Sequence, residues 1–118
     1  MNLSEFKEKI TKNEIISFSE TINVITDNYH YSPTEFSNGL NSDTVINAAG
    51  TNEGSCKIFA FALLNELTES QTLNLFGDYY HKDVLLSPEG IDHANIRTFM
   101  KYGWAGISFN SVALSSMT

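Results

Sequence analysis

The chain has 118 residues and a mass of 13.2 kDa, which is the size of one domain. Hydrophobic residues make up 42% and charged residues 18%, as in a folded globular protein rather than a disordered chain. Seven Lys and Arg against 14 Asp and Glu give a formal net charge of -7, which repels phosphate backbones and anionic membranes. We therefore expect neither nucleic acid nor a membrane among the partners.

The chain has a single cysteine, Cys56, which excludes an internal disulfide and a Cys-rich zinc site. The first residues lack the apolar segment of a secretory signal. The longest dense apolar stretch, residues 58–64, is about a third of a membrane span. These features predict a soluble protein that does not use the general signal-peptide route.

Two helices are predicted in the first thirty residues. Leu3, Phe6 and Ile10 fall at helical spacing, and Asn13 can cap a second helix. The apolar positions of this second helix alternate steps of three and four residues, which predicts one core-facing stripe. The stripe consists of Ile15, Phe18, Ile22, Ile25 and Tyr29.

Residues 29–54 break helical order and allow two interpretations. The first is a strand over residues 29–37 followed by a tight hairpin turn at Asn38-Gly39, because Asn-Gly tolerates positive φ at both turn positions. The second is a short helix opened by residues 32–35, Ser-Pro-Thr-Glu, which read as a capping box with proline at the first helical position. We favour the hairpin slightly and leave the helix open.

A central helix is predicted over residues 58–64, because a helix that is apolar on all sides must be covered on all sides. Thr68 and Gln71 match a capping box for the next helix, which Gly77 ends. Asp78 can cap a further helix that stops at Pro88. The last helix takes Asp92 as its cap and ends at Gly103.

These elements predict a single α+β domain over residues 1–110 that is mainly α, with about five helices and one short β-hairpin. Residues 111–118 are small and polar, and we expect them to form a flexible C-terminal tail.

The chain resembles the HopJ type III effector family from about residue 15 to residue 109, through several ordered segments. The longest is residues 47–62, Asn-Ala-Ala-Gly-Thr-Asn-Glu-Gly-Ser-Cys-Lys-Ile-Phe-Ala-Phe-Ala. The others are Pro33-Thr34, Phe36, Asn38-Gly39, Thr72-Leu73, residues 76–80, residues 83–85, His93, residues 95–97, Phe99-Met100 and Gly103-Trp104. The resemblance implies a bacterial protein of a kind thought to be injected into host cells. It implies no catalytic residue, because the family has no established activity.

Cys56 is the sharpest candidate for chemistry. It lies at the start of the predicted central helix, where unpaired backbone N–H groups and Lys57 favour a thiolate. His93 could act as a base, oriented by Asp92 or Asn95, in a Cys-His-acid arrangement. The competing interpretation, which we favour, is that Cys56 is a small buried apolar residue. We assign no catalytic residue, and Cys56 and His93 remain candidates.

A metal site is not predicted. His81 with Asp83, and Asp92 with His93, could contribute to a His/carboxylate set. Neither pair has the i, i+4 spacing that places two ligands on one helix face, and helix capping already explains Asp92.

A ligand loop is predicted before the central helix, where Asn47, Asn52 and Glu53 lie among glycines. The spacing differs from that of a phosphate-binding P-loop, and Asn side chains in such loops often bond the backbone instead. Arg97, the only arginine, could bind a carboxylate or form a structural ion pair. We expect Arg97 to lie close to this loop, because the two segments that most resemble the family should pack together.

The functional prediction is an effector-like protein that binds or interacts without catalysis and has no cofactor. Its partner, a protein or a small molecule, and its oligomeric state are not predicted. One alternative is a small Cys-dependent enzyme centred on Cys56; another is a bacterial cytoplasmic housekeeping protein with the same fold. We expect a bacterial cytoplasmic location, and the family resemblance adds secretion into a host cell by the type III route.

Overall fold

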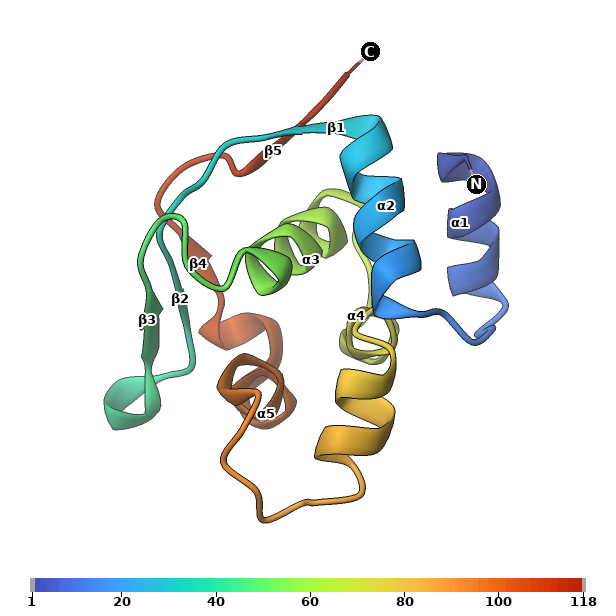
Figure 1. Ribbon diagram of the computed structural model, residues 1–118. Coiled ribbons are helices and arrows are strands. Elements are labelled where there is room, and N and C mark those ends of the chain that lie inside the picture. Colours follow the sequence, from blue (N-terminus) through green and yellow to red (C-terminus); the bar gives the residue numbers. More distant parts are fainter. Residues whose placement is uncertain (1, 118) are drawn as a thin grey trace.

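Helix α3 (Glu53–Leu64) runs through the middle of the molecule, between a β-hairpin on one side and helix α2 (Phe18–Asn28) on the other (Figure 1). The structure is a computed structural model and describes residues 2–117. The other helices are α1 (Leu3–Thr11), α4 (Glu69–Asn74), the π-helix η2 (Tyr79–Val84), α5 (Ala94–Tyr102) and the short 3-10 helices η1 (Asn41–Asp43) and η3 (Gly103–Gly106). The fold is α+β and mainly α, as predicted.

The core forms around α3, as its apolar sequence predicts. Phe59 and Phe61 are both fully buried and point to different groups of aromatic rings. The ring of Phe59 lies 4.9 Å from that of Phe99 on α5, and the ring of Phe61 lies 5.9 Å from that of Phe6 on α1. Because α3 contacts the core on several faces, its side chains fix how the other helices are placed.

Within residues 2–117, five short strands form two small antiparallel sheets. They are β1 (Tyr29–Tyr31), β2 (Phe36–Asn38), β3 (Val45–Asn47), β4 (Ser108–Phe109) and β5 (Leu114–Ser116). One sheet has the order β3-β2-β4, and the other pairs β1 with β5.

A hairpin is confirmed, formed by β2 and β3 with Phe36 opposite Asn47. The single strand predicted over residues 29–37 is wrong: β1 and β2 belong to different sheets, and residues 32–35 between them form no strand. Pro33, which has no backbone N–H to donate to a ladder, lies in this gap. The tight Asn38-Gly39 turn is wrong, because Asn38 is paired with Val45 and a longer connection, residues 39–44, joins the strands. Gly39 has a φ of 103°, which glycine adopts without strain. Residues 32–35, the alternative helix start, contain no helix.

The start of the second helix differs from the prediction. Ser17, not Asn13, is the cap, and its hydroxyl accepts a hydrogen bond from the N–H of Glu20. Ile15 therefore precedes the helix and is 92% exposed. The rest of the predicted stripe does face the core: Ile25 and Tyr29 are buried, and Phe18 and Ile22 pack against the core.

The segment from residue 68 to residue 84 follows the prediction in part. The Thr68 capping box is confirmed, with reciprocal bonds between Thr68 and Gln71, and Gly77 has a φ of 61°. Asp78 makes no side-chain cap, and the turns after it are a π-helix rather than an α-helix. Single π-helical turns are often found near functional sites.

The domain extends past residue 110. Ala113 and Leu114 are 3% and 2% exposed, and residues Leu114–Ser116 form β5, which pairs with β1. The tail predicted for residues 111–118 thus contributes a strand and two core residues, although its last residue, 118, lies outside the described chain.

Candidate functional site

The N-terminal ends of helices α3 and α5 lie close together. Asn52 precedes α3 and His93 precedes α5, and both have left-handed backbones, with φ of 48° and 51°. Neither side chain caps the helix that follows it. The N–H groups in the first turn of an α-helix have no partner within the helix. Both helix starts therefore present backbone donors and the positive end of a helix dipole.

A cavity of about 350 Å³ lies between these helix starts. Its walls come from α2, β3, α3, η2 and α5, with Phe76 before η2. The residues that line it are Phe18, Val45, Asn52, Gly54, Ser55, Phe76, Tyr79, His93, Ala94, Asn95 and Ile96. Gly54 lies directly against the ring of Phe18 in this wall. A Cβ on Gly54 would lie 2.7 Å from the ring, so the close contact depends on glycine.

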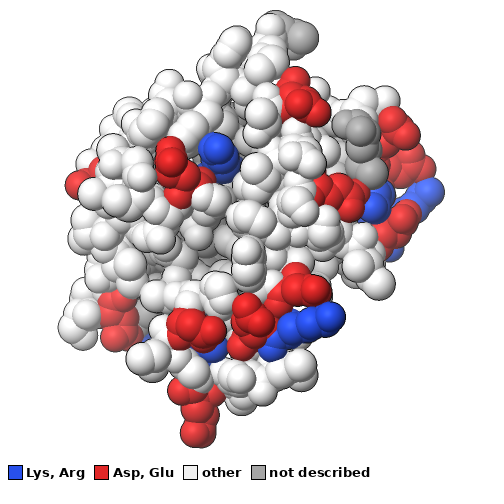
Figure 2. All heavy atoms as spheres, viewed as in Figure 1, with Lys and Arg blue, Asp and Glu red and all other residues white. Residues whose placement is uncertain are grey.

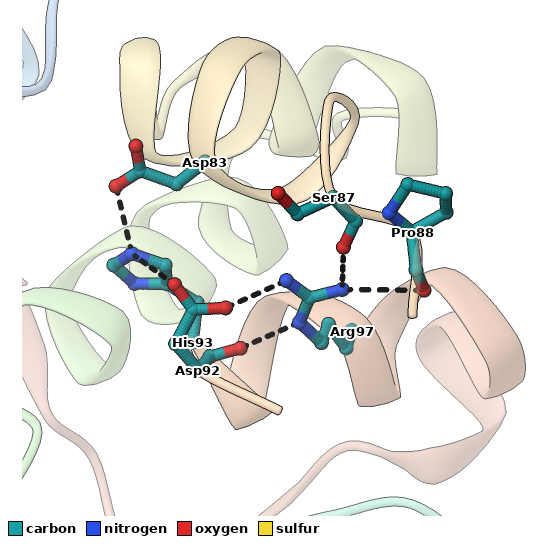
Figure 3. A network of polar contacts seen from close by, with 6 residues as sticks. All are labelled: Asp83, Ser87, Pro88, Asp92, His93 and Arg97. Carbon is teal, nitrogen blue, oxygen red and sulfur yellow. Dashed lines mark hydrogen bonds and ion pairs between the residues drawn. The ribbon is translucent and has the colours of Figure 1, made fainter. Parts of the chain in front are cut away.

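His93 lines the cavity and is held from the π-helix. Its Nε2 lies 3.0 Å from Asp83 Oδ2 (Figure 3). Its ring centroid lies 5.1 Å from that of Tyr79. A carboxylate only accepts hydrogen bonds, so Nε2 donates and the neutral imidazole carries its proton there. Asp83 thus fixes the ring orientation of His93 at the edge of the cavity.

Asp92 does not cap α5, in contrast to the prediction, because its carboxylate is bonded to Arg97. Figure 3 shows the guanidinium of Arg97 reaching the loop before α5. It donates to Asp92 Oδ1 at 2.6 Å, to the Asp92 carbonyl at 2.6 Å and to the Ser87 carbonyl at 2.8 Å. A Cβ on Gly90 would lie 2.6 Å from Nη2, so the loop closes tightly over this side chain.

Arg97 is therefore a structural clamp on residues 87–92. Arg97 is not among the residues that line the cavity. Its hydrogen bonds go to the loop before α5 rather than to Asn47 or Glu53. The predicted proximity of Arg97 to the ligand loop is wrong for this side chain.

The Arg97–Asp92 pair should make part of the stability depend on pH. The hydrogen bond from Arg97 holds the pKa of the Asp92 carboxyl below its ordinary value. A carboxyl whose pKa is lower in the folded state stabilises that state above its unfolded pKa, and the contribution is lost as pH falls through the folded pKa. We expect the free energy of unfolding of Asp92→Asn to be lower than that of the parent protein at neutral pH. Denaturant unfolding measured across pH should show this difference shrinking below pH 3.8.

Asp27→Asn is the matched control, since Asp27 is exposed on α2 and makes no ion pair among the described residues. Its effect on the free energy of unfolding should be smaller than that of Asp92→Asn at neutral pH. An Asp92→Asn difference that stays constant from neutral to acid pH would refute the clamp.

Asn95 makes the contact between α5 and the ligand loop. Its Nδ2 donates to Asn47 Oδ1 at 2.9 Å, and its Oδ1 accepts from Asn47 Nδ2 at 3.1 Å. Asn52 Nδ2 donates to the same Asn47 oxygen at 2.7 Å, and Asn38 Nδ2 donates to the Asn95 carbonyl at 2.8 Å. Three members of this network, Asn38, Asn47 and Asn95, are buried. We call these four residues the asparagine network.

The asparagine network joins both helix starts to the hairpin. Asn52 and Asn95 line the cavity, and Asn47 connects them from β3. Of the predicted ligand residues, Asn52 therefore reaches the cavity, Asn47 supports it, and Glu53 lies exposed in the first turn of α3 outside the lining. The importance of Asn38 and Asn95 was missed, although both lie in segments that resemble the family.

Cys56 lies apart from His93. It is 1% exposed, and its Sγ lies 3.9 Å from the Thr34 carbonyl, on the side of the β1–β2 connection. His93 is bonded to Asp83 instead, so the Cys-His arrangement is not formed. Burial is the main reason that the pKa of the Cys56 thiol is raised, and it outweighs the opposing effect of Lys57.

We therefore expect the Cys56 thiol to react slowly with iodoacetamide in the native state and quickly in denaturant, because the thiolate is both disfavoured and covered. Cys56→Ala should fold and keep any ligand affinity of the protein. Alkylation monitored by mass spectrometry checks this, with the rate in denaturant as the reference. Equal rates with and without denaturant would contradict the burial.

No group of three or more His, Cys, Asp and Glu side chains that could hold a metal ion occurs within residues 2–117. His81 bonds Asn74 Oδ1 at 2.7 Å, whereas Asp83 bonds His93. His81 is thus bonded away from Asp83, whereas His93 Nε2 lies 3.0 Å from Asp83 Oδ2 and 3.8 Å from Asp92 Oδ2.

The fold and the sequence together define the class of protein. Residues 3–114 match the family described as HopJ type III effector protein, so the chain belongs to the HopJ family. A crystal structure of a protein of unknown function, VPA0580, is similar to the chain, with 48% identity and a TM-score of 0.92. The match covers 98% of this chain and 94% of that one. No curated protein matches the chain. Within the described residues, no helix is both long and apolar enough to cross a membrane.

Proposed function

We propose that the protein is a non-catalytic binding protein whose cavity takes a small oxyanion, a phosphate monoester or a carboxylate. The observation that carries this proposal is the meeting of two uncapped helix starts, α3 and α5, at one cavity. Backbone N–H groups and aligned helix dipoles at such a place favour a negative charge.

The other polar groups of the cavity suit the same ligand. Ser55 and Tyr79 bring hydroxyl groups, which can donate hydrogen bonds to it. No lysine or arginine belongs to the lining, so a compact oxyanion fits better than a polyphosphate, whose charge needs cations. On the face shown in Figure 2, basic side chains lie beside acidic ones rather than in a patch, which favours a small ligand over nucleic acid.

The absence of catalysis is supported by the same contacts. The buried thiol of Cys56 faces Thr34, away from the base that it would need, and Asp83 occupies His93 Nε2. The cavity therefore offers hydrogen-bond donors and aromatic walls without an activated nucleophile beside them.

A pair of variants at Ser55 tests the ligand. Ser55 occupies the third position of α3, where aspartate favours the helix, so Ser55→Asp should fold. The asparagine introduced by Ser55→Asn has nearly the same size as the aspartate of Ser55→Asp but carries no charge. We expect Ser55→Asp to weaken methyl phosphate binding by at least roughly tenfold, which corresponds to about 1.4 kcal/mol, because the new carboxylate repels the anion. Ser55→Asn should stay close to the parent protein.

Isothermal titration with methyl phosphate and acetate gives these affinities, and circular dichroism confirms that both variants are folded. Equal affinities of the aspartate and asparagine variants would contradict an anion at this position, as would saturable binding of neither probe to the parent protein.

The family description adds where such a protein acts. We infer that the protein is made in the bacterial cytoplasm and delivered to a host cell by type III secretion. A fusion to an adenylate cyclase reporter tests this by measuring cyclic AMP in host cells. A signal that disappears without a working secretion apparatus supports delivery. No signal, beside a positive control effector, would favour a cytoplasmic housekeeping role.

A further inference from the structure

A second hollow adjoins the cavity. It has a volume of about 530 Å³ and lies along residues 15–19 and the start of η2. Phe18 and Tyr79 line both spaces, with ring centroids 4.9 Å apart in an edge-to-face contact. This pair of rings thus borders both spaces.

Ile15 lines the second hollow and is 92% exposed. The backbone beside it is fixed. The Glu14 carbonyl accepts a hydrogen bond from Asn74 at 3.1 Å. A Cβ on Gly77 would lie 2.7 Å from the N of Phe18 and 3.1 Å from the carbonyl oxygen of Ile16, so the segment packs closely on this turn. The exposed side chain of Ile15, on a backbone fixed by these contacts, presents apolar surface that a ligand can cover.

We infer that this hollow binds the apolar arm of the same ligand, so that the ligand is a small amphiphile free in solution: an oxyanion with an alkyl chain. The inference rests on the proposed function, because the oxyanion anchors the arm. Asp78 also lines the hollow, and its carboxylate disfavours a second anionic group there. The arm is therefore uncharged and apolar, and it contacts Ile15 and the rings of Phe18 and Tyr79.

Methyl phosphate and hexyl phosphate, which share the charged group and differ in the arm, test the inference by isothermal titration below micelle-forming concentrations. We expect hexyl phosphate to bind roughly tenfold more tightly, because part of the added chain leaves water. Ile15→Ser should remove most of this gain and leave methyl phosphate affinity unchanged. Val112→Ser is the matched control: Val112 is 71% exposed and lines a different hollow, so the gain should persist.

Four results would overturn the inference. If methyl phosphate binds and hexyl phosphate binds no more tightly, the apolar arm is wrong and the oxyanion site stands. If Ile15→Ser and Val112→Ser leave the same gain, the chain is covered elsewhere. If neither phosphate binds, the proposed function fails and the inference fails with it. Binding to vesicles that contain phosphatidic acid without binding to hexyl phosphate would replace the free amphiphile with a membrane lipid.

Discussion

Phe59→Ala should lower the free energy of unfolding by about 3–5 kcal/mol, the range measured for large aromatic side chains removed from a core. Phe59 is fully buried on α3. Its ring centroid lies 6.0 Å from that of Phe36, 5.6 Å from that of Phe76 and 4.9 Å from that of Phe99. These rings come from β2, from the turn after α4 and from α5. The cavity left by alanine therefore cannot be closed by moving one element.

Chemical denaturation monitored by circular dichroism measures this loss. Leu63→Ala on the same helix is the control, because Leu63 is 46% exposed and its truncation should cost less than about 1 kcal/mol. Similar losses for the two variants would show that α3 is not the centre of the core.

The second large effect is expected in the asparagine network. Asn47→Ala and Asn95→Ala should each cost about 1–3 kcal/mol. Asn47→Ala leaves the buried Nδ2 of Asn95 without a partner. Asn95→Ala removes the shortest bond of Asn47 Nδ2, which keeps only contacts of 3.4 Å to the Phe36 and Val45 carbonyls. The double variant should cost less than the sum of the two, since the first substitution already breaks the pair of bonds that they share.

A double-mutant cycle in denaturant gives the coupling between Asn47 and Asn95. Asn110→Ala is the control: Asn110 is exposed and bonds the exposed carboxylate of Glu35, so its loss should be small. Additive effects of Asn47→Ala and Asn95→Ala would show that the two side chains do not act as one unit.

Local signals predicted the elements that depend on local physics. The all-apolar stretch 58–64 identified the central helix, and Thr68 with Gln71 identified the start of α4, because both patterns are complete within a few residues. Asn38-Gly39 located the hairpin but not its turn, since the connection includes η1, whose Asp43 accepts a hydrogen bond from Lys101 on α5.

Capping rules failed where two residues compete. Both Asn13 and Ser17 suit a helix cap, and the helix begins at the later one, which leaves Ile15 outside the core. Asp92 is a better cap by residue type than His93, but Arg97 takes its carboxylate, and His93 enters the left-handed region before α5 instead. Such choices are made by tertiary contacts that no local pattern contains.

The candidate site was predictable in part for the same reason. Asn47 and Asn52 lie five residues apart in one loop, and the loop is visible in the sequence. Asn95 reaches that loop from 48 residues away. The sequence offered it only as a residue that could orient His93, because no local pattern shows a contact with Asn47. The Ala113-Leu114 pair was likewise too short an apolar signal to identify β5.

The most direct test of the account is an NMR titration of the nitrogen-15-labelled protein with methyl phosphate, read at each backbone amide. The amides of Gly54 and Ser55 on α3 and of Ala94 and Asn95 on α5 should shift together and saturate at one affinity, because one anion contacts both helix starts. Shifts confined to the exposed lysines, or shifts of one helix start without the other, would contradict a shared oxyanion site.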